Sequence, residues 1–528
     1  MNCEPTTVNG YTSLEDFMLT RLKVSGFKNL VDVDVHFGPF NCVTGANGSG
    51  KSNLFDAIKF LSALSGSTLI DAAVSVCGEG GKTPDILGLF HCVGGKYDKE
   101  ISFEAEIIIP EQGVDDLGQK AKAGITFLRY IVTIAYRADD GLHPTGSLEL
   151  VREELDRINL QDASKHLKFP HKAGLWRKSV IKGKRTKPFI STENSGKQRG
   201  PGIIKLIQDG VKGRTKTFQA AILPRTVLSA VNAENPTAFL AQREMQSWQV
   251  LRLKPSSLWR PDKFTTPPGL GADGSHLSAT LHYLSHLPDS SNLVSSNPDS
   301  SNKVSDNKAA LIYDQIASRL SKFNENIYKV SVERDEKREL LILEVIDHDG
   351  TVHQASSVSC GTLRFLAMIV LELDTRAGGL ICLEEPENSI YPDRIPEVLK
   401  LLQDMATNPK KPVGPDNPLR QIIINTHSPI ILNQVSADDL LFAELKELER
   451  DDLRFKRSCF SFLPDTWRKK AFPESDTVSK DKLFSYLKSI FPAEGQSLDI
   501  SPKSKQKKSK STDERFDPQL QLPTFRDV

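Results

Sequence analysis

The 528-residue sequence predicts an α/β protein in which several parallel strands deliver polar groups to one site. Three stretches lead to this prediction: a strand, glycine-rich loop and helix at 40–64, an apolar strand ending in two acids at 380–385, and an apolar strand ending in Thr-His-Ser at 421–428. The carboxyl ends of parallel strands share one sheet edge, and α/β proteins bind ligands there. We therefore expect these distant stretches to meet at a single site.

The composition is that of an ordinary water-soluble globular chain, with 68 Lys and Arg against 67 Asp and Glu. Its seven cysteines are scattered and contain no C-x-x-C pair, which fits neither a disulfide framework nor a structural zinc site. The sequence contains no secretion-signal pattern and no apolar run of about 18 residues. We expect a cytoplasmic protein that does not contact a membrane.

The stretch GANGSGKS at 45–52 fits the phosphate-loop pattern G-x-x-x-x-G-K-[ST]. Alternating apolar residues over 19–44 precede it, and apolar residues at helical spacing follow it. We expect the loop N–H groups to wrap phosphates, Lys51 to reach the terminal phosphates and Ser52 to coordinate Mg²⁺. The candidate nucleotide-binding residues are Gly45, Ala46, Asn47, Gly48, Ser49, Gly50, Lys51, Ser52 and Asn53.

Two further strands predict the remaining catalytic groups. The strand 380–383 ends in Glu384 and Glu385, about 330 residues after the phosphate loop. Adjacent side chains at a strand end point different ways, so we assign Glu384 to the Mg²⁺ shell and Glu385 to the attacking water. The strand before Thr-His-Ser places His427 where it can contact the γ-phosphate. These paired acids on a remote strand disfavour a GTPase.

The region between these stretches is less regular. Alternation predicts sheet strands at 100–110 and 127–137. Residues 165–216 contain fifteen Lys or Arg against Glu193 and Asp209, with Trp176 and Phe189 among them. This pattern predicts a loop-rich basic insertion, which is either a solvated face or an arm that contacts nucleic-acid phosphates. The repeated PDSSN segment predicts an exposed, disordered loop at 287–307.

Five ordered motifs resemble the ABC-type ATPase heads of the RecF/SMC/OLD kind, and in particular their stand-alone "predicted ATPase" branch. They are GFKNL at 26–30, GANGSGKSN at 45–53, SCGTLRFLA at 359–367, LEEPEN at 383–388 and THSP at 426–429. The resemblance implies a P-loop NTPase sheet with flanking helices and an antiparallel β subdomain. An inserted middle region and a C-terminal extension would complete the fold. A transporter is disfavoured because the signature is not the transporter form.

The resemblance also implies ATP and Mg²⁺ as cofactors and a dimer of heads with composite sites. Ser359, Gly361 and Thr362 of one copy would then act in trans on nucleotide held by the other. Two positions depart from the family pattern: Cys360 stands where an acid is usual, and Tyr391 where a histidine is common. The sequence offers no convincing Q-loop glutamine.

These motifs predict six regions along the chain. An N-terminal segment and the first ATPase lobe precede the basic insertion; a middle region, the second ATPase lobe and a C-terminal extension with a basic tail follow it. Their expected bounds are 1–18, 19–164, 165–239, 240–355, 356–445 and 446–528.

Three functions remain open. The size and C-terminal extension resemble the PtuA-type ATPases of Septu and retron-associated anti-phage systems. That resemblance implies a sensor that controls a separate HNH nuclease, with a reverse transcriptase and its msDNA as further partners in a retron. The alternatives are a RecF-like ATPase that binds DNA through 165–216, and a slowly hydrolysing ATP-bound scaffold.

Overall fold

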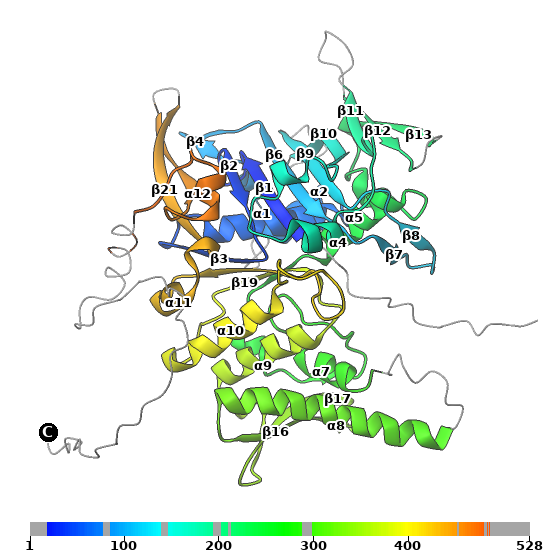
Figure 1. Cartoon of the computed structure of the whole chain (residues 1–528), viewed down its shortest axis with the longest axis vertical. Helices are drawn as coiled ribbons and strands as arrows, with labels where there is room; N and C mark the ends of the chain where they lie inside the picture. Colours follow the sequence, from blue (N-terminus) through cyan, green and yellow to red (C-terminus); the bar gives the residue numbers. More distant parts are fainter. Residues whose placement is uncertain are drawn as a thin grey trace, which may run out of the picture.

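The computed structural model describes residues 18–77, 85–138, 146–193, 202–209, 213–287, 298–450 and 453–479, together with residues 483 and 485. Two sheets and their helices form most of the molecule (Figure 1). The larger sheet lies in the upper part of that view, and a smaller layer of helices and strands lies below.

The site-bearing sheet has six strands in the order β14-β19-β20-β3-β21-β22. Neighbouring strands from β14 to β21 run parallel, and only β22 is antiparallel to its neighbour. The three strands singled out from the sequence are therefore adjacent, which confirms the predicted parallel sheet. Their bounds are β14 (Gln249–Leu251), β19 (Leu380–Glu384), β20 (Gln421–Thr426), β3 (Phe40–Gly45), β21 (Leu440–Arg450) and β22 (Leu453–Ser461).

Each face of this sheet contributes to a separate hydrophobic core, because successive side chains in a strand point to opposite faces. Val43 and Cys382 pack with the helices that follow the phosphate loop. Cys42 and Ile381 pack with the helices on the other face. The principal helices are α1 (Lys51–Leu64) and α5 (Pro236–Ser247) on the first face, with α9 (Cys360–Leu373) and α10 (Ile395–Met405) on the second.

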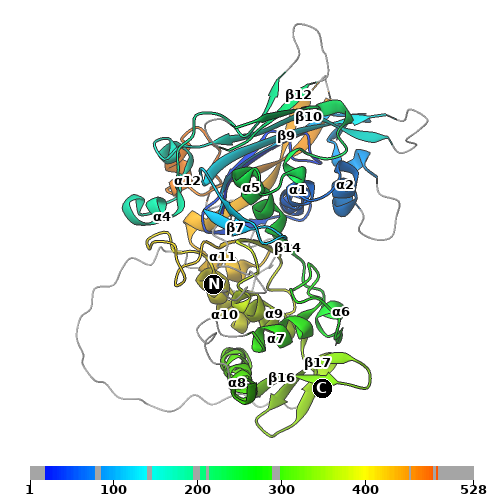
Figure 2. The same cartoon turned by 90° about the vertical axis from the view of Figure 1, so that its right-hand side faces the viewer.

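The second sheet is antiparallel and curves over α1 and α5 (Figure 2). It confirms the strands expected at 100–110 and 127–137. The basic insertion also contributes three strands to it, so this region is not simply the set of loops that we expected. In sheet order the strands are β13 (Thr215–Gln219), β12 (Ile203–Ile207), β11 (Ile190–Glu193), β10 (Ser147–Arg157), β9 (Phe127–Arg137), β6 (Glu100–Ile108), β1 (Met18–Ser25) and β2 (Val33–His36).

Short elements connect these strands. Those around the first core are α2 (Leu69–Cys77), η1 (Leu87–Leu89), β4 (Cys92–Val93), β5 (Lys96–Tyr97), β7 (Gln112–Val114) and β8 (Lys120–Lys122). Those in and after the basic insertion are α3 (Ala163–His166), η2 (Ala173–Arg177), α4 (Lys178–Val180), η3 (Ala220–Ile222) and η4 (Leu228–Ala230).

The middle region forms its own layer around a small antiparallel sheet. The expected disordered loop needs correction, because residues 298–307 are the first residues of a long helix; residues 288–297 lie outside the described part. The elements are α6 (Pro255–Leu258), β15 (Asp262–Lys263), α7 (Leu277–Ser285), α8 (Pro298–Phe323), β16 (Ile327–Asp335), β17 (Leu340–Asp347), β18 (Val352–Gln354) and η5 (Ala355–Ser357).

The boundary expected after residue 445 falls inside β21. The first part of the expected C-terminal extension is therefore the end of β21 together with β22, both in the site-bearing sheet. The remaining elements are η6 (Pro392–Arg394), α11 (Pro429–Gln434), η7 (Ala437–Asp439) and α12 (Trp467–Ala471). Among the described residues, the structure contains no helix of the length and apolar character that crossing a bilayer requires.

Candidate nucleotide-binding site

The phosphate loop leaves β3 at Gly45 and enters α1 at Lys51. Ala46, Asn47 and Gly48 are exposed, as a surface that receives a ligand requires. Lys51 is 7% exposed, and its Nζ donates to the carbonyl oxygens of Gly45 at 2.7 Å and Ala46 at 3.0 Å. Burial lowers the pKa of Lys51, and the charge of Glu385 opposes this shift. The lysine is thus held inside the loop, close enough to Glu385 to be influenced by its charge.

Glycine is required for structural reasons at two positions of this loop. Gly45 and Gly50 have φ angles of 146° and 101°, a region that favours glycine. A Cβ on Gly45 would collide with the carbonyl oxygen of Ala443, and one on Gly50 with the Ser458 hydroxyl. The close approach of β21 and β22 therefore requires glycine at both positions.

Ser458 and Asn29 fix the loop from outside the predicted motif. Ser458 Oγ donates to the Ser49 carbonyl at 2.8 Å, and its backbone N–H donates to the Asn29 carbonyl at 2.9 Å. Asn29 Oδ1 also accepts from Asn53 Nδ2 at 2.6 Å. Asn29 belongs to the GFKNL motif, so the sequence contained a signal for it. Ser458 lies in the expected extension and had no such signal.

Glu384 is the last residue of β19 and lies in register with Asn425 of β20. Arg252, which follows β14, places its Nε 3.8 Å from Glu384 Oε2. Ser52 is exposed at the start of α1. A carboxylate and a hydroxyl at one sheet edge match the oxygen ligands that Mg²⁺ uses together with substrate phosphates. The donor set therefore fits the expected ion.

Glu385 and His427, predicted separately, are brought together by the fold. His427 Nδ1 lies 3.1 Å from Glu385 Oε1, and Asn388 Nδ2 donates to Glu385 Oε2 at 2.5 Å. Since an ionised carboxylate can only accept, this pairing requires the proton on Nδ1. Glu385 has a φ of 45°, and its N–H donates to Asn425 Oδ1 at 3.0 Å. Because the backbone turns at Glu385, its side chain points in a different direction from that of Glu384.

The residues that surround this pair lie within the sequence motifs but were not among the predicted site residues. Arg364 Nη1 donates to the Glu385 carbonyl at 3.5 Å. Glu387 is 6% exposed and accepts from the Thr426 hydroxyl, which in turn accepts from the Ser428 N–H at 2.9 Å. Burial raises the pKa of Glu387, and the Thr426 hydrogen bond opposes this shift. This network joins the ends of β19 and β20.

The signature residues form the start of α9. Ser359 is the exposed N-cap, and its Oγ accepts from the Thr362 N–H at 3.2 Å. Thr362 Oγ1 lies 2.8 Å from the same oxygen. Gly361 is packed so closely that a Cβ would lie 2.6 Å from the Ser389 carbonyl oxygen. Within one chain the signature therefore contacts the turn after β19, while Lys51 contacts its own loop.

Two family models match separate segments of the chain. Residues 246–433 match the model described as "AAA domain, putative AbiEii toxin, Type IV TA system". Residues 18–73 match the model described as "RecF/RecN/SMC N terminal domain". No curated protein matches the sequence.

Solved structures of Smc heads also align with the chain. One is an Smc head bound to the C-winged helix domain of ScpA, with 12% identity over 83% of this chain and 97% of that chain and a TM-score of 0.40. A second, from Pyrococcus furiosus, carries an extended coiled coil and is bound to the C-terminal domain of ScpA; it has 11% identity over 90% and 99% and a TM-score of 0.40. A third is the SMC head domain from Thermotoga maritima, with 10% identity over 84% and 98% and a TM-score of 0.31.

The two matched segments include the phosphate loop, the signature, both acids and His427. The fold places the loop, the acids and the histidine at the ends of three adjacent parallel strands. Over these two segments the chain is similar to AAA-type and RecF/RecN/SMC-type ATPase domains.

Proposed function

We propose that the chain binds ATP with Mg²⁺ and hydrolyses it in a site completed by a second copy. One observation carries this proposal: the phosphate loop, Glu384, Glu385 and His427 follow β3, β19 and β20, which are neighbours in one parallel sheet. Lys51 and Ser52 hold the phosphates, and Glu384 with Ser52 holds the metal. Mg²⁺ supplies charge neutralisation for the leaving phosphates.

Glu385 orients the attacking water in this proposal. Its two carboxylate oxygens are already positioned by His427 at 3.1 Å and Asn388 at 2.5 Å. These two contacts restrict the Glu385 side chain to one rotamer. The carboxylate is therefore kept in the orientation that a general base needs to reach the attacking water. His427 is 43% exposed in its side chain, so it can contact a phosphate while it holds Glu385.

Ser359 supports pairing of two heads. It is exposed at the N-terminus of a 14-residue helix, where a hydroxyl and free N–H groups favour an anion. The chain already contains its own phosphate loop, so a partner's nucleotide is the anion that this end fits best. The Ser359–Thr362 segment then acts in trans, as the family resemblance implies.

The test of hydrolysis compares wild type with Glu385→Gln. We expect the variant to bind ATP as wild type does and to release phosphate at least about a hundredfold more slowly, because the general-base contribution is lost. Phosphate release and nucleotide affinity are measured on the same preparations, with Glu447→Gln, at an exposed position of β21, as the matched control. Tight ATP binding without phosphate release by wild type would favour the scaffold. Absence of ATP binding would overturn the proposal.

We further propose that ATP turnover controls a partner nuclease of the HNH type in an anti-phage system. The description of the family matched over 246–433 names an AAA domain and a putative toxin of a type IV toxin–antitoxin system, which associates an ATPase domain of this kind with such a system. The separate nuclease follows only from the sequence resemblance. The test is co-purification of the chain with the products of its neighbouring genes, followed by phage plating. Nuclease recovery and loss of protection by Lys51→Ala support the proposal; protection that persists without ATP binding contradicts it.

A further inference from the structure

A cavity of about 240 Å³, which we call the α9 cavity, lies at the amino-terminal edge of the site-bearing sheet. Its walls come from the first residue of β14, the loop before α7, α7 itself, and the carboxyl end of α9 with the turn that follows. Figure 2 shows these elements together where the upper and lower layers meet. The lining includes Gln249, Leu270, Thr280, Leu371, Asp374 and Arg376.

The α9 cavity is separate from the candidate nucleotide site. β14 and β19 run parallel, and Gln249 pairs in register with Ile381, three residues before Glu384. Gln249 therefore lies toward the amino ends of the strands, about 10 Å along the sheet from the acids. Because α/β proteins bind their substrates at the carboxyl ends of the strands, the α9 cavity is not part of the catalytic site.

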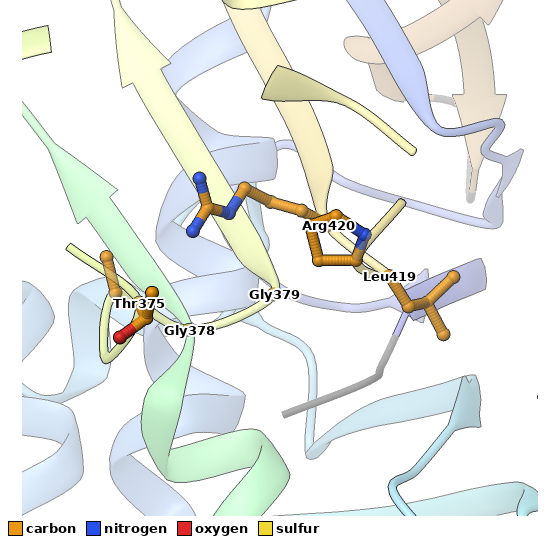
Figure 3. A pocket seen from close by; sticks show the side chains of 7 residues that line it. Thr375, Gly378, Gly379, Leu419 and Arg420 are labelled. Atoms are coloured by element: carbon orange, nitrogen blue, oxygen red, sulfur yellow. The ribbon is translucent and has the colours of Figure 1, made fainter. Parts of the chain in front are cut away.

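The turn between α9 and β19 forms a rigid wall of this cavity. Arg420, which is 6% exposed, donates to the Glu372 carbonyl at 3.0 Å and to the Asp374 carbonyl at 3.3 Å. Gly378 lies so close to Ser247 that a Cβ would be 2.7 Å from the serine Oγ. Figure 3 shows this other side of the turn, where the hollow beside Arg420 has a volume of about 10 Å³, roughly that needed by one water. Tight packing on that side fixes the position of the turn on the cavity side.

A second wall, the loop before α7, is held to that helix by Thr280. The Thr280 side chain is buried, and its Oγ1 accepts from the Gly269 N–H at 2.9 Å and donates to the His276 carbonyl at 2.6 Å. Leu270, the next residue of the loop, packs against the same hydrophobic core as Leu371 of α9. The cavity therefore has apolar surface from two elements, and contacts within the chain position both.

The two charged residues of the cavity pair with each other. Arg376 donates from Nε and Nη2 to the two carboxylate oxygens of Asp374, each at 2.9 Å. The Arg376 guanidinium also lies 4.0 Å from the centre of the Tyr283 ring, and Asp374 is 4% exposed. Bidentate pairs of this kind are strong and geometrically specific. A charged ligand would have to break this pair, so the cavity favours an uncharged one.

Gln249 supplies the polar group that a ligand can satisfy. Its Oε1 is buried and has no hydrogen-bond partner among the described residues, although buried polar atoms are nearly always paired. A side-chain amide presents an acceptor oxygen beside a donor NH₂ group. The matching ligand edge carries a donor beside an acceptor, and glutamine forms this paired contact with the edge of adenine.

We propose that the α9 cavity binds an uncharged nucleobase or nucleoside, with its ring against Leu270 and Leu371 and its edge paired with the Gln249 amide. Nucleobases combine a flat face with a donor and an acceptor on one edge, which are the features that these walls and this amide complement. Drug-sized ligands occupy pockets of about 300 to 1,000 Å³, so about 240 Å³ suits a smaller, base-sized ligand. This inference goes beyond the ATPase proposal and does not depend on it, because it concerns binding at a separate site.

The experiment measures binding of adenosine to the full-length protein by isothermal titration calorimetry. The matched ligand is purine riboside, which lacks the exocyclic amine of adenosine. We expect wild type to bind adenosine at least about tenfold more tightly than purine riboside, because purine riboside leaves Gln249 Oε1 unpaired. Gln249→Leu should remove this preference, whereas Gln403→Leu, at an exposed position of α10, should keep it. The comparison of the two nucleosides on wild type tests the proposal even if Gln249→Leu folds poorly.

Three results would each overturn the proposal: no adenosine binding at about 1 mM, equal affinity of wild type for the two nucleosides, or a preference that survives Gln249→Leu. Displacement of adenosine by ATP would also overturn it, because adenosine would then occupy the nucleotide site. Tighter binding of AMP than of adenosine, lost in Gln249→Leu, would contradict the uncharged ligand. Adenosine affinity that Lys51→Ala leaves unchanged within about twofold supports a separate site. Failure of wild type to bind ATP would contradict the ATPase proposal alone.

Discussion

At the scale of single residues, Arg252 is the group that changes the expected chemistry of the site. It follows β14, where the parallel register places it beside Glu384, and its Nε lies 3.8 Å from that carboxylate. If Glu384 holds Mg²⁺ as proposed, a guanidinium at this distance would compete with the ion for the carboxylate. Because the Arg252 side chain is 64% exposed, solvent screens the pair and its effect is modest.

We therefore expect Arg252→Ala to lower the Mg²⁺ concentration that gives half-maximal ATP binding, by up to about fivefold. The measurement is nucleotide affinity over a Mg²⁺ titration, with the exposed Arg260→Ala as control. An unchanged Mg²⁺ dependence with weaker ATP binding at saturating Mg²⁺ would contradict this role and would place Arg252 on the phosphates instead.

His36 makes the stability of the chain depend on pH. Its ring packs against Phe472 with centroids 4.2 Å apart, and burial lowers its pKa to about 4. An unfolded histidine titrates near about 6.5, so between these values the unfolded chain binds more protons. The contribution of His36 is complete above about pH 6.5 and is lost as the pH falls toward 4.

We expect His36→Phe to reduce the decrease in the free energy of unfolding that wild type shows at acidic pH. Between pH 7 and pH 4.5, the free energy of unfolding of wild type should fall by about 2 kcal/mol more than that of the variant. Urea unfolding at the two pH values measures the difference. Equal decreases in both proteins would show that His36 is not the titrating group.

The residues that sequence reasoning found lie within contiguous motifs, whereas those it missed act through strand pairing. Lys51 and Glu385 are recognisable from their immediate neighbours in the sequence. Arg252, Asn425 and Ser458 acquire their roles because β14, β20 and β22 occupy particular places in the sheet. No local pattern encodes that order, so single-sequence reasoning could not assign them.

At the scale of elements, the surroundings of position 360 in α9 would stabilise an acidic side chain there. Cys360 is the first residue of this helix, and Arg364 lies one turn later. Arg364 is 7% exposed, and its Nε has no hydrogen-bond partner among the described residues. A carboxylate at position 360 would lie at the positive end of the helix dipole and one turn from the buried Arg364 guanidinium. Both would attract its negative charge.

We expect Cys360→Asp to stabilise the chain by about 0.5–1 kcal/mol and to leave ATP affinity unchanged. Thermal unfolding of wild type, Cys360→Asp and the uncharged control Cys360→Ser measures the effect. A lower melting temperature for the aspartate variant would show that the N-terminus of α9 cannot accept the charge.

Element boundaries were the least predictable part of the fold. Helical periodicity identified α1, because its apolar spacing is strong and local. The basic insertion contains β11, β12 and β13, whose short alternation is interrupted by Lys and Gly. The start of α8 consists of Ser, Asn and Asp, residues that favour loops, so composition alone predicted no helix there.

At the scale of the whole molecule, the C-terminal strands belong to the nucleotide site rather than to an appendage. β22 contacts the phosphate loop through Ser458, whose Oγ donates to Ser49 at 2.8 Å. The expected boundary after residue 445 would remove this strand. The head is therefore assembled from both ends of the chain, with the middle region inserted between them.

The composite-site proposal makes a prediction about two copies rather than one. Ser359→Arg places a large cation at the exposed start of α9. In a Glu385→Gln background, we expect ATP with Mg²⁺ to produce dimers, and Ser359→Arg to bind ATP normally but to remain monomeric. Light scattering measures the mass, and the exposed Ser357→Arg two residues earlier is the control.

Mixing two defective chains distinguishes action in trans from action in cis. Lys51→Ala removes nucleotide binding but keeps a normal signature, while Ser359→Arg keeps nucleotide binding and loses the signature. If the signature acts in trans, a mixed dimer contains one intact site, so the mixture should release phosphate at a rate well above either chain alone. No recovery, together with loss of ATP binding by the Ser359→Arg monomer, would mean that Ser359 serves its own chain's nucleotide.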